Sequence, residues 1–187
     1  MGYALKLLAI GKNSAKGIEV RVHPAFVKDS HPLASVNDSY NAVYINGDSV
    51  DDVMLYGRGA GALPTGSAIV GDIIYCATHE NYSYSPFDNT ENADPSTKFI
   101  TNFESAYYIR LIAEDRAGVL AKVSSVLSKQ DISLAQVIQE KDKTSEGAVQ
   151  LIIVTHDTFE KKVKKAVEEI NSKENLAKVA SVIRVVS

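Results

Sequence analysis

The sequence predicts a protein of the α+β class, in which a partial mixed or antiparallel sheet layer precedes a small domain of alternating strands and helices. Two observations carry this prediction. Apolar residues alternate at period two in several short runs and recur at helical spacing in others. A polar segment over residues 80–105, rich in Asn, Ser, Thr, Asp and Pro, separates two regions. We therefore expect one region over 1–79, a linker over 80–105 and a second domain over 106–187.

The second domain begins with a predicted strand and helix. Residues 106–114 alternate in polarity, which predicts a strand whose more deeply buried face carries Tyr107, Ile109 and Leu111. Residues 115–130 predict a helix with Asp115 as its N-cap. The inner face of this helix is expected to consist of Val119, Val123, Val126 and Leu127.

A hairpin, a second helix and a last strand follow. Two β-rich runs, 132–141 and 147–156, flank a polar turn, and Asp157 with Glu160 three residues later predicts a capped helix start. The inner face of this helix is expected to consist of Val163, Ala166, Val167 and Ile170. Residues 178–186 predict the closing strand. The order βαββαβ is that of the ferredoxin-like fold, with two helices on one face of a four-stranded antiparallel sheet.

The first region contains more strands than helices. A helix is predicted over 64–78, with Pro64 in its first turn. Strands are predicted over 3–11, 17–27, 41–47 and 52–57. One short helix cannot cover both faces of such a sheet, so we expect an apolar face that needs a partner.

Composition and charge exclude several classes of function. The net charge of the 187 residues is −3, so no basic field attracts nucleic acid or an anionic membrane, and neither is expected as a partner. No apolar run approaches the ~20 residues that cross a bilayer. Cys76 is the single cysteine, which excludes an internal disulfide and fits a reducing, cytoplasmic location. We expect it to be buried as a small apolar residue.

Gly57, Gly59 and Gly61 stand at alternate positions between a predicted strand and a predicted helix. The pattern is one residue short of the dinucleotide-binding fingerprint. A glycine-rich turn that enters a helix exposes unpaired N–H groups, which favour an anion or a polar group the size of an amide. The same glycines also suit a positive-φ turn and close strand–helix packing without a ligand. The residues alone leave both interpretations open.

The four histidines predict no chemistry. His23 and His31 each precede a proline, which favours extended backbone at a strand end or turn, and no orienting carboxylate stands at a recognisable spacing. His79 and His156 are isolated near element ends. No Cys, His, Asp and Glu cluster has the spacing of a metal site, so we expect neither a metal nor a catalytic residue in these residues.

Four stretches together resemble, in order and spacing, the C-terminal part of the catalytic region of homoserine dehydrogenase. They are GYALKLLAIG (2–11), GIEVRVHPAFV (17–27), HPLASVNDSYNAV (31–43) and DVMLYGRGAGALPTGSAIVGDII (52–74). Residues 107–187 resemble the ACT domain that ends many bacterial forms of that enzyme. The resemblance implies an NAD(P)-dependent oxidoreductase that interconverts L-aspartate 4-semialdehyde and L-homoserine in threonine, methionine and isoleucine biosynthesis. It also implies that Gly61, with Gly59 and Gly57, contacts the cofactor.

The family's nucleotide-binding domain, its substrate-binding Glu and Asp and its catalytic Lys precede the first of these stretches. By resemblance the chain is therefore a regulatory and partly catalytic piece, which needs the missing N-terminal part as a partner. We expect it to bind no cofactor by itself and to be inactive alone. The alternative is a non-catalytic module for amino-acid binding or dimerisation.

In ACT domains, a small amino acid generally binds between two domains, against the turn from the first strand to the first helix. That turn is 114–120 here, and the resemblance implies threonine or methionine as the effector. The positions expected to bind it are Asp115, Ala117, Gly118, Val119, Asp131 and Gln136. The physical chemistry of these residues supports only a small zwitterion. Because an unpaired sheet edge associates readily, we expect a homodimer or higher homo-oligomer.

Overall fold

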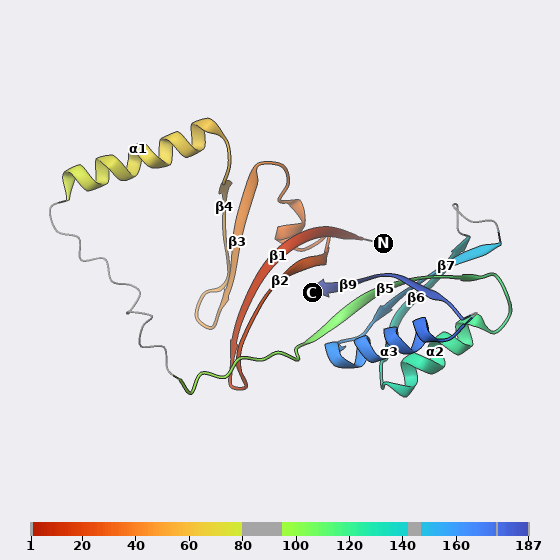
Figure 1. The fold of residues 1–187 in the computed structure, drawn as a ribbon. Coiled ribbons are helices and arrows are strands. Elements are labelled where there is room, and N and C mark those ends of the chain that lie inside the picture. Colours follow the sequence, from red (N-terminus) through yellow and green to blue (C-terminus); the bar gives the residue numbers. More distant parts are fainter. Residues whose placement is uncertain (1, 80–94, 142–146, 175, 187) are drawn as a thin grey trace. The chain divides into compact units, whose positions relative to one another are not determined.

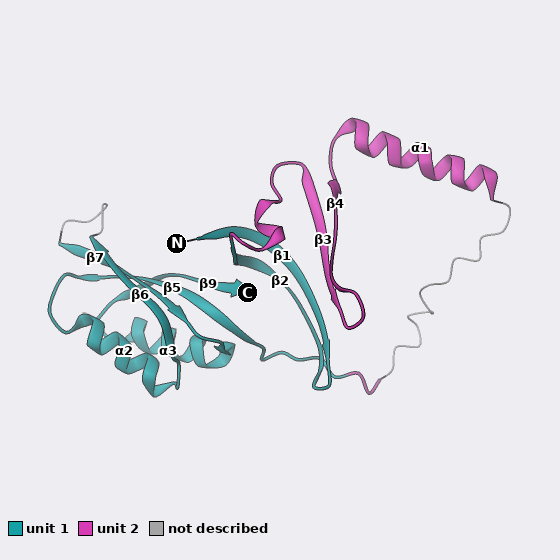
Figure 2. Cartoon of the chain, turned by 180° about the vertical axis from the view of Figure 1, so that it is seen from behind, with its two compact units in different colours: residues 1–28, 98–187 teal, residues 29–97 magenta. Residues whose placement is uncertain are grey.

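The computed structural model describes residues 2–79, 95–141, 147–174 and 176–186. The chain forms two compact units (Figure 2): the first comprises residues 1–28 and 98–187, and the second comprises residues 29–97. These units do not follow the expected boundaries at 79/80 and 105/106, because the N-terminal hairpin joins the sheet of the second domain. The predicted turn 142–146 and most of the predicted linker lie outside the described residues.

The first unit is built on one sheet with the order β1-β2-β9-β5-β7-β6, and β8 pairs with β5 beside this path. Its strands are β1 (Tyr3–Ser14), β2 (Gly17–Lys28), β5 (Glu104–Glu114), β6 (Leu134–Lys141), β7 (Ala148–Thr155), β8 (Thr158–Phe159) and β9 (Lys178–Val186). The four strands β9-β5-β7-β6 pair antiparallel in the order of the ferredoxin-like fold. The predicted fold of this domain is confirmed.

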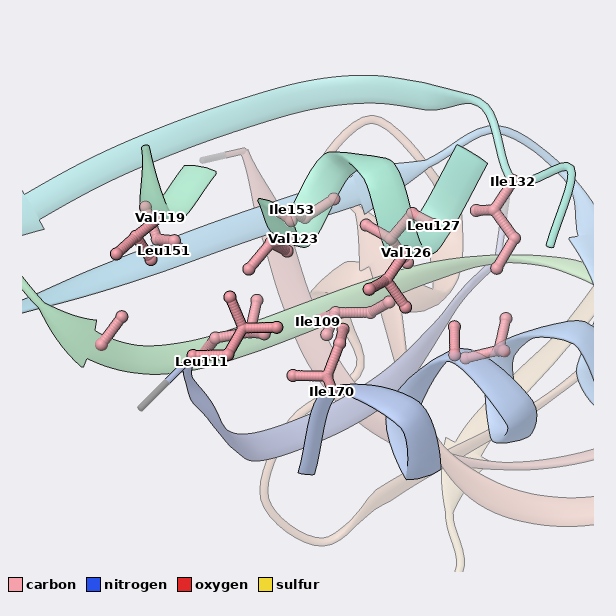
Figure 3. Close-up of a cluster of buried hydrophobic side chains, with 14 of the residues drawn as sticks. Ile109, Leu111, Val119, Val123, Val126, Leu127, Ile132, Leu151, Ile153 and Ile170 are labelled. Atoms are coloured by element: carbon pink, nitrogen blue, oxygen red, sulfur yellow. The ribbon is translucent and has the colours of Figure 1, made fainter. Parts of the chain in front are cut away.

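Two helices, α2 (Val119–Lys129) and α3 (Glu160–Ser172), cover one face of these four strands (Figure 1). The expected inner faces of both helices are confirmed, with Val167 half-buried at the edge of the core. Between helices and sheet lies an apolar core, and Figure 3 shows Ile109 and Leu111 of β5 within it. Tyr107 of β5 also belongs to this core. This core is the main source of stability in the first unit, because burial of apolar surface dominates folding.

Both helices begin differently from the prediction. Gly118, in the left-handed conformation with φ 88°, occupies the N-cap of α2, so Asp115 is not its cap. The start of α3 is preceded by the short strand β8, so Asp157 is not its cap either. Asn102 Oδ1 instead accepts from Lys161 N at 3.2 Å. Residues just before β5 therefore take over the capping that a local side chain was expected to provide.

The β1–β2 hairpin joins this domain through a short parallel ladder in which Ala25, Phe26 and Val27 pair with Arg184, Val185 and Val186. On the face away from the helices, the Phe26 ring meets the Tyr108 ring edge-on, with centroids 4.9 Å apart. These contacts explain why the hairpin belongs to the first unit.

The alternation along β2 is inverted relative to simple hydrophobic patterning. Its polar residues Glu19, Arg21 and His23 are buried, whereas Val20 and Val22 are 65% and 69% exposed. An alternating strand usually turns its apolar residues inward. The buried polar face of β2 is therefore a feature that calls for a specific explanation.

The second unit contains β3 (Tyr40–Gly47), β4 (Asp51–Arg58), α1 (Ala62–Thr78) and a short 3₁₀ helix, η1 (Pro32–Ser35). Strands β3 and β4 form an antiparallel hairpin, and the predicted strands and helix are confirmed. Cys76 on α1 is exposed, contrary to the expectation that it is buried. Apolar residues on α1 and on the β3–β4 hairpin are exposed, among them Ile73 and Leu55. They form the kind of apolar face that we expected to need a partner.

Among the described residues, no helix is long and apolar enough to cross a membrane. In the same part of the chain, no group of three or more His, Cys, Asp or Glu residues is arranged to hold a metal ion.

Candidate functional site

A cavity of about 230 Å³ lies at the turn between β5 and α2. Four of the six positions expected to bind an effector line it: Asp115, Ala117, Gly118 and Val119. The other lining residues are Glu114, Arg116, Leu120, Gln139, Val149 and Leu151. The turn, the start of the helix and two neighbouring strands thus enclose one small space.

The polar side of this cavity is built from backbone and carboxylates. No side chain caps the start of α2, and the first N–H groups of a helix have no partner within it. They combine with the positive end of the helix dipole to favour a carboxylate. Glu114 and Asp115 supply carboxylate oxygens for a cation, and Glu114 Oε2 also lies 3.5 Å from Arg116 Nε. The cavity therefore offers complementary partners to both ends of a zwitterion.

Asp131, expected at this site, does not line the cavity. Its Oδ2 atom accepts from Lys162 Nζ of α3 at 2.7 Å, and this hydrogen bond lowers the pKa of Asp131. With φ 55°, Asp131 forms the left-handed turn that leads into β6. Its visible role is to tie this turn to α3.

Gln136 does not line the cavity either, and Gln139 is found there instead. The β6–β7 register shifts between Leu134 and Gln136. After this bulge Gln136 pairs with Val154, which packs on the sheet face away from the helices, whereas Gln139 pairs with Leu151 of the helix-side core. A bulge reverses which residues point to a given face, and strict alternation cannot reveal it.

The second candidate site is the glycine loop of the second unit, where β4 ends and α1 begins. Arg58 Nη1 donates to Ser39 Oγ at 2.9 Å, and its guanidinium lies 4.7 Å from the centroid of the Tyr40 ring. Tyr40 in turn stacks on Tyr56 at 4.8 Å. Arg58 is therefore held against the start of β3, and the loop has a defined shape.

The three glycines of this loop differ in what they do. A Cβ atom on Gly59 would lie 2.7 Å from Cγ of Asn41, so the Asn41 side chain would have to move to accept a larger residue at this position. Gly61 is the N-cap of α1 with φ 119°, and no side chain caps the helix. A Cβ on Gly57 would meet nothing within 4 Å. The loop thus combines structural glycines with open space and an uncapped helix start.

The two His-Pro histidines have different environments. His31 is the N-cap of η1, where its Nδ1 accepts from Leu33 N at 3.1 Å. Its ring lies 4.7 Å from that of Tyr44, and a hydrogen bond to Asp52 raises the pKa of Tyr44. Asp52 on β4 is the carboxylate near His31. The spacing of these two residues along the sequence did not reveal that they are close. His23 is buried in β2.

Comparison with known proteins assigns a family to each of the two regions of the chain. Residues 1–74 match the family model described as homoserine dehydrogenase, and residues 107–175 match that of the ACT domain. The chain corresponds to the C-terminal part of homoserine dehydrogenase together with an ACT domain. The resemblance seen in the sequence and the α+β fold class are thereby confirmed.

Individual homoserine dehydrogenases support this assignment. Those of Neisseria gonorrhoeae and Corynebacterium glutamicum are 35% and 36% identical to this chain, over 100% and 98% of its length. The crystal structure of the Thiobacillus denitrificans enzyme matches the whole chain with a TM-score of 0.82 and 34% identity. The chain spans 44%, 42% and 43% of these three relatives, so it is less than half of the homoserine dehydrogenases that it matches.

Proposed function

We propose that the chain is the amino-acid-sensing and partly catalytic portion of a homoserine dehydrogenase, which interconverts L-aspartate 4-semialdehyde and L-homoserine with NAD(P). The observation that carries the sensing role is the cavity at the β5–α2 turn, which collects Asp115, Ala117, Gly118 and Val119. The proposed effector is threonine or methionine.

Each part of such a ligand has a partner in the cavity. The N–H groups at the start of α2 bind the carboxylate, and Asp115 accepts from the ammonium. Val149 and Leu151 provide an apolar wall for the side chain. Gln139, which replaces Gln136 in this role, offers an amide to a hydroxyl or thioether.

Thermal unfolding with added threonine or methionine tests this proposal. A ligand at 100 times its Kd stabilises the folded state by about 2.7 kcal/mol, so we expect Tm to rise with ligand concentration. The Asp115→Ala variant loses this increase. Asp131→Ala is the matched control, because Asp131 lies outside the cavity, and it retains the increase. If neither amino acid raises Tm, or if both variants respond alike, the assignment of the cavity is wrong.

We also propose that the loop 57–61 faces the nicotinamide cofactor in the complete enzyme, with Gly61 as the principal contact. The uncapped start of α1 and the open space at Gly57 fit an anionic or amide group. When bound, the cofactor accepts or gives the hydride. The loop supplies N–H donors and a close-fitting backbone.

Catalysis by these 187 residues alone is not expected, since they span less than half of the relatives. The chain is mixed with homoserine and NADP, and absorbance is followed at the reduced-nicotinamide band. We expect the rate of a blank. Turnover above that rate would overturn the inactivity proposal without affecting the sensing proposal.

We propose at least a homodimer. Within the described residues, β6 is a terminal strand of the sheet and pairs with β7 alone, whereas β2 covers the edge of β9. Unpaired edges associate unless they are blocked. Light scattering at micromolar concentration should report a dimer or larger species, and a monomer would contradict it. A dimer that gives no response to threonine or methionine would favour the alternative function, a dimerisation module.

A further inference from the structure

The buried polar face of β2 forms a cluster of ionisable side chains with β9 and α3. Glu19, Arg21 and His23 are 9%, 8% and 7% exposed. Charged residues are almost never buried to this degree unless they are paired, so the partners of each decide what the cluster does.

Two arginines in this cluster share one aromatic ring. The guanidinium of Arg21 lies 4.6 Å from the centroid of Phe103, and that of Arg184 lies 5.2 Å from it. Arg21 Nη1 is 2.6 Å from Glu19 Oε1, and Arg184 Nη2 is 2.6 Å from Glu160 Oε2. Each arginine thus pairs with one carboxylate, and the exposed Lys164 of α3 lies 2.8 Å from the other oxygen of Glu160.

Tyr107 of β5 completes the surroundings of the cluster. Burial, followed by the Glu160 charge, raises the pKa of Tyr107. Its buried hydroxyl has no hydrogen-bond partner among the described residues. The phenol is therefore neutral at physiological pH. Together with Glu19, Arg21, Glu160 and Arg184, it makes up the charged and titratable environment of His23.

The hydrogen bond that His23 makes decides which ring nitrogen carries the proton when the imidazole is neutral. Its Nδ1 donates to Pro24 O at 2.9 Å, because a carbonyl oxygen can only accept. Nε2 is then the acceptor nitrogen, and it is buried without a hydrogen-bond partner among the described residues. The Nε atoms of Arg21 and Arg184 are also buried without a hydrogen-bond partner among the described residues. Because the charges of Arg184 and Arg21 both oppose protonation of His23, an unprotonated imidazole suits the site and a further positive charge does not.

We propose that His23 is a proton-operated latch: its protonation at mildly acidic pH weakens the docking of the β1–β2 hairpin onto β9 and α3. The ladder between β2 and β9 has three residue pairs, so the hairpin depends on side-chain contacts to stay in place. The hairpin lies in the region matched as homoserine dehydrogenase, whereas Tyr107 and Glu160 lie in the ACT region. Protonation of His23 therefore acts where these two regions meet.

The direction of the pH effect follows from burial. Desolvation lowers the pKa of His23 from 6.5, and Arg184 and Arg21 lower it further, against the opposing effects of the Pro24 carbonyl and Glu160. The unfolded chain then binds more protons than the folded one below 6.5. The stabilisation is complete above this pH and is lost as the pH falls through the lowered pKa of the folded state.

The test uses the whole chain and a pair of matched variants. His23→Asn keeps a donor for Pro24 O but does not titrate, and His156→Asn makes the same change at an exposed histidine of the same unit. Tm is measured at about pH 7.5 and about pH 5. We expect the wild type and His156→Asn to lose a few degrees more than His23→Asn between the two pH values. Equal losses in all three proteins would overturn the proposal.

Hydrogen exchange of the wild type provides a measurement that needs no variant. After correction for the intrinsic pH dependence of exchange, amides of residues 25–27 should lose protection at about pH 5 before those of β5 and β7 do. Uniform loss of protection across the sheet would contradict local release of the hairpin. Unchanged protection of residues 25–27 would contradict the latch itself.

Discussion

Arg184 on β9 and Glu160 in the first turn of α3 form an ion pair of 2.6 Å in which both side chains are largely buried. Burial alone would raise the pKa of Glu160, but hydrogen bonds from Arg184 and Lys164 outweigh it and lower this pKa below 4.5. The pair fastens the last strand of the ferredoxin-like domain to its second helix. Removal of Glu160 leaves Arg184 without its carboxylate partner in a partly dry site, and removal of Arg184 leaves Glu160 with only the exposed Lys164.

We therefore expect Arg184→Met to destabilise the chain by on the order of 2–4 kcal/mol. Lys164→Met removes the exposed partner of the same carboxylate and should cost about 0–1 kcal/mol. Urea unfolding measures both values. Glu160 stabilises the fold above pH 4.5, and this contribution is lost as the pH falls through its lowered pKa. Arg184→Met should therefore show the weaker acid dependence, and equal effects of the two variants would contradict this view of the pair.

The apolar core of the first unit provides a second prediction. Leu111 is fully buried between the sheet and the helices, whereas Leu7 on β1 is 74% exposed. Leu111→Ala removes contacts and leaves a cavity, so its cost should be about 2–5 kcal/mol. Leu7→Ala should change the free energy of unfolding by less than about 0.5 kcal/mol. Chemical denaturation of the two variants checks this, and a large cost at Leu7 would show that β1 is covered in solution.

Gly118 provides a prediction about the candidate sensing site. Its φ of 88° is left-handed, and a Cβ there would meet nothing within 4 Å. Gly118→Ala should therefore cost about 1 kcal/mol through backbone strain alone, and Gly118→Asn less, because Asn tolerates this conformation. Thermal unfolding without ligand compares them. If the Ala variant were as stable as the wild type, this turn would have a different conformation.

A further prediction concerns the different roles of Gly57 and Gly59 in the glycine loop. Gly59→Ala places a methyl group against Asn41, while Gly57→Ala has free space. We expect the first variant to broaden or shift the NMR resonances of the 39–41 segment and the second to leave them unchanged. Asn41→Ala in the Gly59→Ala background should restore much of the wild-type spectrum. Failure of this rescue would show that the contact does not constrain the loop.

The sequence was sufficient for the βαββαβ order and for the inner faces of both helices, because apolar periodicity decides these features. Prediction from the sequence failed where a residue from a distant segment makes the contact that a nearby residue was expected to make. Asp157 has the spacing of a cap, yet Asn102 takes up a donor of α3 across 59 residues of sequence. Gln136 lies outside the cavity because a bulge shifts the β6–β7 register, and no pattern in the sequence indicates this bulge.

The inverted face of β2 is the largest departure from simple patterning. Nothing in its alternation of valines with Glu19, Arg21 and His23 indicates that the polar residues turn inward. Their burial depends on Arg184, Glu160 and Phe103, which are contributed by segments far along the chain. Long-range charge pairing of this kind becomes visible only once the strands are placed beside one another.

The most direct test of the sensing role is to map the backbone amide resonances of the whole chain during titration with threonine and with methionine. We predict saturable shifts centred on Ala117, Gly118, Val119 and Gln139, with none at Gly57, Gly59 or Gly61 for either amino acid. Shifts confined to other segments, or no saturable shift with either ligand, would contradict the assignment of the β5–α2 cavity as the effector site.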